Sequence, residues 1–179
     1  MSSEAIFWGT NHEHFALEAY KNNMIQNSHI NVILSESGLV LSESILWLGC
    51  SPDELCYCDC CGTRLVEIKC PFKHRQNMQA EDLYYDKETG FTPSGSINVN
   101  HRYYAQVQTQ MLITSIHTCG FVVWTPHLLL IYTTMRDQDF CNSFAKSSKL
   151  FFKYVILPEL VTRRIGNSNV IVPPCSPST

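Results

Sequence analysis

The chain has 179 residues, 45% of them hydrophobic, which suits a single globular domain with a real core. No apolar run approaches the ~20 residues that a membrane span needs, and the first residues lack the pattern of a secretory signal. We therefore expect an intracellular protein without a membrane partner, and the net charge of −3 argues against a broad basic surface for nucleic acid.

The first predicted element is a helix over residues 12–25, because apolar side chains recur there at helical spacing. Glu13 falls at the start of this helix, where a carboxylate suits the helix dipole. The residues that follow predict two short strands, 29–34 and 39–41, joined to each other as a hairpin.

Two further strands are predicted at residues 46–49 and 64–70, and the second is rich in side chains that favour a pleated, half-buried surface. Side chains alternate along a strand, so Glu67 and Lys69 share one face. If these two strands pair as a hairpin, Asp53, which lies between them, comes close to that face.

Two carboxylates and an ammonium would then meet at the end of a strand. Oxygen ligands of this kind bind Mg²⁺, which activates water and stabilises charge on a phosphate. A lysine beside such a metal can orient or deprotonate the attacking water. Because Glu-x-Lys alone is more often a solvated strand face, the prediction depends on the pairing of Glu67 and Lys69 with Asp53.

Five of the nine cysteines fall within fifteen positions of one another. They are Cys56, Cys58, Cys60, Cys61 and Cys70. A disulfide framework would need an oxidising compartment, which nothing else in the sequence supports. Closely spaced thiolates also bind zinc, although this run lacks two separated Cys-x-x-Cys pairs. Free thiols in a hairpin loop are the simpler interpretation, and a structural Zn²⁺ site is the alternative.

The stretch after the predicted metal strands is the least regular, with a short helix predicted at 76–83 and a surface hairpin around 83–91. Lys73, Arg75 and Arg102 give this region a local positive charge that could contact DNA. Without the carboxylate motif, they would be interpreted as an ordinary solvated face.

A helix is predicted over residues 101–114, in which Tyr103, Gln106 and Gln110 share one face. A glutamine both donates and accepts hydrogen bonds, so Gln106 could hold a water or a phosphate oxygen. An exposed polar face is the commoner fate of glutamine, and that interpretation stays open at this point.

Two β-branched and apolar runs, 120–125 and 128–134, predict adjacent strands. A long helix follows over 140–157, with an aromatic stripe that we expect in the core. Pro158 should kink or end this helix.

The Pro-Asp pair that ends at Asp53, followed by Glu67-Ile-Lys69, resembles the PD-(D/E)XK nuclease signature. The longer sequence around both motifs resembles that of the YqaJ-like viral recombinase family, relatives of phage lambda exonuclease. Residues 8–20 and 103–111 resemble the first helix and the glutamine-bearing helix of that family. The resemblance continues into a later strand and is domain-wide. We expect a nuclease domain over residues 1–165 and a loose tail over 166–179.

The resemblance implies an α/β fold of the restriction-endonuclease-like type, with a central mixed β-sheet flanked by helices. It implies a DNA exonuclease, dependent on Mg²⁺ or Mn²⁺, that works in recombination or in a viral or mobile element. The implied site residues are Asp53, Glu67 and the Ile68 carbonyl as metal ligands, Lys69 acting on water, and Glu13 and Gln106 completing the site. The implied partners are duplex DNA ends, a single-strand annealing protein and two further copies of the chain in a trimer. In a eukaryote, the nucleus would be a suitable compartment.

Glu54 departs from the family pattern, which usually has glycine after the motif aspartate. Two alternatives therefore stay open: a DNA-binding domain of the same fold with impaired catalysis, and an interaction module stabilised by zinc at the cysteine cluster. The family also usually has a phosphate-contacting segment upstream of the first motif, so this chain could be a fragment.

Overall fold

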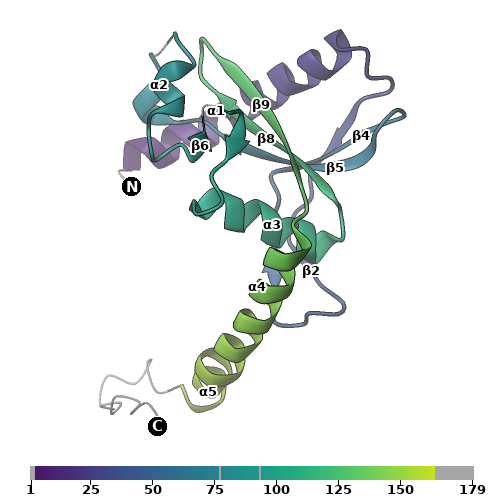
Figure 1. The fold of residues 1–179 in the computed structure, drawn as a ribbon, viewed down its shortest axis with the longest axis vertical. Helices are drawn as coiled ribbons and strands as arrows, with labels where there is room; N and C mark the ends of the chain where they lie inside the picture. Colours follow the sequence, from purple (N-terminus) through teal and green to yellow (C-terminus); the bar gives the residue numbers. More distant parts are fainter. Residues whose placement is uncertain (1–2, 77, 93, 164–179) are drawn as a thin grey trace.

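The computed structural model describes residues 3–76, 78–92 and 94–163. At its centre is a five-stranded mixed sheet in the order β1-β4-β5-β8-β9, in which β5 and β8 are parallel and the other neighbours antiparallel (Figure 1). Its strands are β1 (Ile33–Ser35), β4 (Glu54–Cys58), β5 (Gly62–Lys69), β8 (Thr118–Trp124) and β9 (Leu129–Met135). Two small antiparallel ribbons pair β2 (Val40–Leu41) with β3 (Gly49–Cys50) and β6 (Phe91–Thr92) with β7 (Ser96–Ile97).

Helices cover both faces of the sheet, with α1 (Ser3–Gln26) on one face and α3 (Arg102–Thr114) on the other. The remaining helical segments are η1 (Phe72–His74), α2 (Glu81–Tyr84), α4 (Gln138–Phe151), the π-helical turn η2 (Phe152–Ile156) and α5 (Leu157–Thr162). Among the described helices, none has both the length and the apolar character to cross a membrane.

The alternation of side chains along β5 decides where the site lies. Val66 and Ile68 point into the apolar layer under α1, together with Tyr20 of that helix. Leu65 and Glu67 point to the opposite layer, under α3. A carboxylate is therefore carried into the interior between α3 and the sheet, at the end of a strand that is otherwise apolar there.

The predicted strand pairing is wrong. Strands β1 and β2 do not form a hairpin with each other, since β1 pairs with β4 and β2 with β3. The hairpin partner of β5 is β4, which faces it in the register Glu54 opposite Val66. The cysteine-rich run concealed this strand, because Cys56 and Cys58 were interpreted as loop residues. They are in fact the buried positions of an alternating strand whose Tyr57 is exposed.

Two helical predictions also need correction. The first helix begins at Ser3, so Glu13 lies in its middle and not in its first turn. The helix predicted at 76–83 is limited to the single turn of α2, and the nearby hairpin is the β6–β7 ribbon. The helix at 101–114 and the adjacent strands before and after Pro126 are confirmed.

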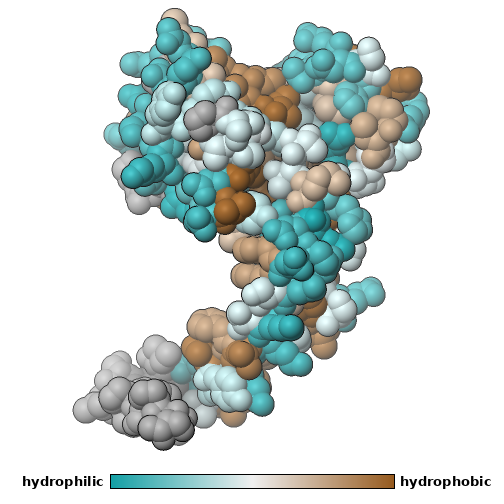
Figure 2. All heavy atoms as spheres, viewed as in Figure 1, coloured by the Kyte–Doolittle hydropathy of each residue, from teal (hydrophilic) through white to brown (hydrophobic). Residues whose placement is uncertain are grey.

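The last helix does not end at Pro158. Proline lacks an N–H, and its ring crowds the carbonyl four residues earlier. The chain accommodates both effects with the wider turn of η2 immediately before α5, whose first turn contains the proline. The apolar stripe is not all core, since Phe151 and Val155 are 57% and 48% exposed. Together α4, η2 and α5 form a rod that points away from the sheet (Figure 1). Apolar side chains are exposed on this rod (Figure 2). The predicted tail, 166–179, lies outside the described residues.

Candidate active site

Glu67 is fully buried at the end of β5 and is held by three donors. Gln106 Nε2 donates to Oε1 at 2.6 Å, and Gln110 Nε2 donates to Oε2 at 2.7 Å. The Lys69 ammonium also donates to Oε1. A carboxylate offers about four lone-pair positions. The three donors therefore fix its orientation and leave acceptor capacity for one further partner.

Asp53 lies immediately before β4, and the hairpin register places its position next to that of Glu67. The backbone N–H of Ile68 donates to Asp53 Oδ2 at 2.7 Å. This hydrogen bond fixes one oxygen of the carboxylate against β5. The structure thus brings together the three residues of the sequence motif, although through β4 and not through the strand that the sequence predicted.

Burial raises the pKa of the Glu67 carboxyl; the Lys69 ammonium opposes this shift, and Asp53 adds to it. Burial also raises the pKa of Asp53, against the opposing effects of the Ile68 amide and Lys69. Glu13, on α1, has a pKa raised by burial and then by the charge of Asp53. Asp53 thus repels both Glu67 and Glu13, and the Lys69 ammonium favours the charged form of all three carboxylates.

The pKa of Lys69 depends on the same carboxylates. Its burial favours a lower pKa, but the carboxylates of Glu67 and Asp53 outweigh this effect and raise the pKa of Lys69. Its Nζ lies 5.1 Å from the centre of the Tyr103 ring, a position that favours a cation. Lys69 is therefore held as a charged donor.

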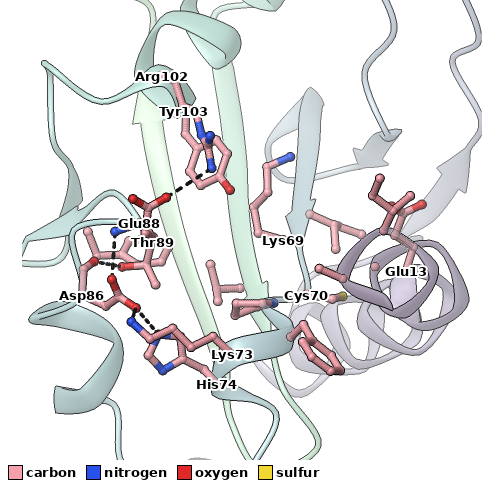
Figure 3. Close-up of a pocket in the computed structure, with 18 of the residues that line it drawn as sticks. Glu13, Lys69, Cys70, Lys73, His74, Asp86, Glu88, Thr89, Arg102 and Tyr103 are labelled. Atoms are coloured by element: carbon pink, nitrogen blue, oxygen red, sulfur yellow. Dashed lines mark hydrogen bonds and ion pairs between the residues drawn. The ribbon is translucent and has the colours of Figure 1, made fainter. Parts of the chain in front are cut away.

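A cavity of about 690 Å³ opens beside Lys69, between α1, η1 and α3. Figure 3 shows Glu13 on α1 at one side, Tyr103 and Arg102 from α3 at the other, and Lys69 between them. Gln106 also lines this cavity. Lys69 and Glu13 therefore face a space that is open to a ligand, and Glu67 lies buried behind Lys69.

Two of the three predicted DNA-contacting residues line this cavity, and both face an acidic partner. Lys73 Nζ lies 2.7 Å from Asp86, and Arg102 lies 3.7 Å from Glu88 in an exposed pair. Arg75 is outside the cavity lining: its guanidinium donates to the Phe72 carbonyl at 2.8 Å and covers the Phe72 ring.

A second cavity, of about 400 Å³, lies on the other side of Glu13 and is strongly acidic. Its lining includes Glu36, Asp53 and Glu54. Glu54 is buried, and burial, followed by the charges of Glu36 and Asp53, raises its pKa. Glu54 opens strand β4 and is not among the described non-glycine residues with positive φ, so the absence of glycine here creates no left-handed strain.

The cysteine run separates into two groups. Cys58, Cys60 and Cys61 converge at the β4–β5 turn, together with His29, which the sequence analysis did not select. Cys56 and Cys70 lie outside this cluster, in the apolar layer under α1 to which the buried Cys58 also belongs. The Cys58-x-x-Cys61 spacing was a usable signal for the convergence. His29 could be found only from the fold, because it lies in the link between α1 and β1.

Gln110 is the other contact that was not assigned a role from the sequence. The helical spacing placed it on one face with Gln106, which was a usable signal. Its partner could not be identified without the position of α3 over β5, because Gln110 and Glu67 are 43 residues apart.

No curated protein sequence matches this chain. Among the solved structures that match it, two match over 93% of its length, with 25% sequence identity and a TM-score of 0.66, and the match covers 76% of each. They are the alkaline exonuclease LHK-Exo from Laribacter hongkongensis and the same protein in complex with dAMP. The predicted α/β fold of the PD-(D/E)XK nuclease type is thereby confirmed. The family model for the YqaJ-like viral recombinase domain matches residues 1–117, which contain the whole carboxylate–lysine site, and the chain therefore belongs to this family.

Proposed function

We propose that this protein is a metal-dependent exonuclease that hydrolyses phosphodiester bonds at DNA ends. The main support is the meeting of Asp53, Glu67 and Lys69 at the end of a sheet, with Lys69 opening into the large cavity and Asp53 into the smaller one. Membership of the family and the likeness to an alkaline exonuclease, once crystallised with dAMP, favour the same function.

The donor atoms available at the site fit a hard divalent cation, Mg²⁺ or Mn²⁺. They are all oxygens, and the three carboxylates leave an excess of negative charge over the single ammonium. We assign Asp53, Glu67 and the Ile68 carbonyl as the ligands, with Glu13 assisting. When bound there, the ion would supply an activated water and stabilise charge on the phosphate.

The remaining roles fall to the residues around the ligands. Lys69, held charged by Glu67 and Tyr103, would orient the attacking water and contact the phosphate. Gln106 and Gln110 would keep the Glu67 carboxylate in one orientation. Gln106 also reaches the cavity, where its amide could contact the substrate.

The charge of the two cavities decides which one takes the DNA end. Phosphates are repelled by the acidic cavity around Glu36 and Glu54. The larger cavity offers Lys73 and Arg102, and exposed ion pairs such as Arg102–Glu88 are weak enough for a phosphate to compete with them. Assembly as a trimer, a single-strand annealing partner, a role in recombination and an intracellular or nuclear location all stay predictions from the resemblance.

The test compares linear duplex DNA with a covalently closed circle of the same sequence, in Mg²⁺ and in excess chelator. We expect nucleotide release from the linear substrate only, and only with the metal present. Equal degradation of both substrates would contradict action at ends. If the folded protein binds DNA ends without cleaving them, the alternative of an impaired domain is favoured. Glu54→Gly, which removes the additional buried carboxylate, would then be expected to restore cleavage.

A further inference from the structure

A second cluster of metal-binding side chains lies at the opposite end of β4 from Asp53. It consists of His29 Nδ1 and the sulfurs of Cys58, Cys60 and Cys61, all within 4.8 Å of one another. Cys60 Sγ lies 3.0 Å from His29 Nδ1, and the other two sulfurs lie 3.6 Å and 3.5 Å from it. Cys60 lies 3.5 Å from Cys58 and 3.6 Å from Cys61.

Most of these separations are close to the edges of a zinc tetrahedron. Zn–S bonds of ~2.3 Å and Zn–N bonds of ~2.0 Å give edges of about 3.5–3.8 Å. Four of the five distances are 3.5 or 3.6 Å. A disulfide would instead bring two sulfurs to ~2.05 Å, and all three cysteines are free.

The backbone around the cluster is organised to hold it. Cys58, Cys61 and the following Gly62 have the Cys-x-x-Cys-Gly order, and Gly62 has a φ of +70°, which favours glycine. The Asp59 N–H donates to the Ile30 carbonyl at 3.0 Å, joining the β4–β5 turn to the segment after α1. Asn31 strengthens the same junction by donating to the Asp59 carboxylate at 2.7 Å.

Charge at the cluster is also compensated. Three thiolates and one zinc ion carry a net charge of −1. The half-buried Arg64 guanidinium lies near enough to interact electrostatically with Cys58 and Cys61. Cys60 and Cys61 are exposed, so metal can reach the site without unfolding of the core.

We propose that His29, Cys58, Cys60 and Cys61 bind a structural Zn²⁺ ion. Four protein ligands close the coordination sphere, which is typical of a structural site and not of a catalytic one. Cys58 is five positions along the extended chain from Asp53, or about 17 Å. The ion would join the end of α1 to the β4–β5 hairpin, the elements that carry Glu13, Asp53 and Glu67.

The first measurement is the metal content of the full chain, purified reduced and without chelator. The measurement is made in the Asp53→Asn variant, which lacks one ligand of the proposed nuclease site, so that metal bound at that site contributes less to the zinc content. We expect about one zinc per chain, and Co²⁺ substitution should give a sulfur-to-cobalt charge-transfer band that carboxylate ligands do not produce. Zinc-free protein that also gives no such band would overturn the proposal.

The second measurement compares ligand variants with a matched cysteine. Changes to residues that merely orient a metal ligand weaken binding about 10- to 100-fold, so Cys61→Ser and His29→Ala should weaken zinc binding at least ~10-fold. Cys56→Ala, two residues from Cys58 in the same strand but outside the cluster, should keep the full zinc content. Unchanged zinc in both ligand variants, or loss of zinc in Cys56→Ala alone, would show that the site is elsewhere.

Discussion

At the residue scale, Glu67 shows how a buried charge is maintained. A carboxylate without partners in the interior would be strongly destabilising or would take up a proton. Here Gln106, Gln110 and Lys69 all donate to it, from α3 and from the same strand. Gln110 is itself buried, so its amide is aimed at Glu67 by packing and does not depend on solvent.

Gln110→Met removes this donor while nearly conserving the side-chain volume. Because groups that orient a metal ligand typically contribute 10- to 100-fold, we expect cleavage to fall by about that factor and to require more Mg²⁺ for half-maximal rate. Rates measured against Mg²⁺ concentration test this. Gln108→Met is the control, since Gln108 is a buried glutamine of the same helix that donates to the Met135 carbonyl, away from the site. An equal Mg²⁺ requirement in the two variants would contradict the role given to Gln110.

The site residues that could be predicted from sequence are those whose relation is local. Glu67 and Lys69 share a face through strand alternation alone, and Asp53 is marked by the turn chemistry before it. His29 is different, because its meeting with Cys60 joins positions 31 residues apart and depends on the packing of α1 against the hairpin. No local pattern contains that information.

At the element scale, β4 and α1 show what the sequence left undetermined. β4 alternates the buried Glu54, Cys56 and Cys58 with the half-buried Leu55 and the exposed Tyr57, a pattern concealed by the expectation that clustered cysteines occupy a loop. The actual turn of the hairpin is only Asp59–Cys61, so the pairing of β4 with β5 depends on register and not on a strong turn signal. Helix α1 was predicted too short because its first turns lack an apolar stripe. These turns line the large cavity and do not pack fully against the sheet.

A single carboxylate joins η1 to the loop after α2 and so shapes the cavity wall. Asp86 accepts from Lys73 and His74, at 2.7 Å and 2.6 Å, and its pKa is lowered chiefly by the Lys73 hydrogen bond. A carboxyl whose folded pKa lies below the unfolded value of ~3.9 contributes stability above that value and loses it as the pH falls.

Asp86→Asn should therefore lower the Tm at pH 7, and the difference from wild type should shrink between pH 5 and pH 3. Thermal unfolding followed across this range, without metal, is the measurement. Asp82→Asn, an exposed carboxylate on α2, is the control and should change the Tm little at any pH. A difference for Asp86→Asn that stays constant from pH 7 to pH 3 would contradict the account.

At the scale of the whole molecule, the carboxylate cluster and the thiol cluster lie at opposite ends of the β4–β5 hairpin. The carboxylates of Asp53 and Glu67 lie at the end of β5 beside the large cavity, and the thiols of Cys58, Cys60 and Cys61 lie at the other end of the hairpin. Helix α1 runs between the two and contributes Glu13 to the first, while His29 follows its end. The rod of α4 and α5 leaves this body with exposed apolar residues, which is where the expected self-association could be sought.

The most direct test of the central claim is the Mg²⁺-dependent digestion of linear duplex DNA by wild type and by Asp53→Asn. Asparagine retains an oxygen to accept the Ile68 N–H, so the fold should persist, whereas alanine would leave this amide without its partner. We expect Asp53→Asn to bind DNA ends as wild type does and to cleave them at least ~10³-fold more slowly, because the metal loses a charged ligand. Equal rates in the two folded proteins would contradict the assignment of this site.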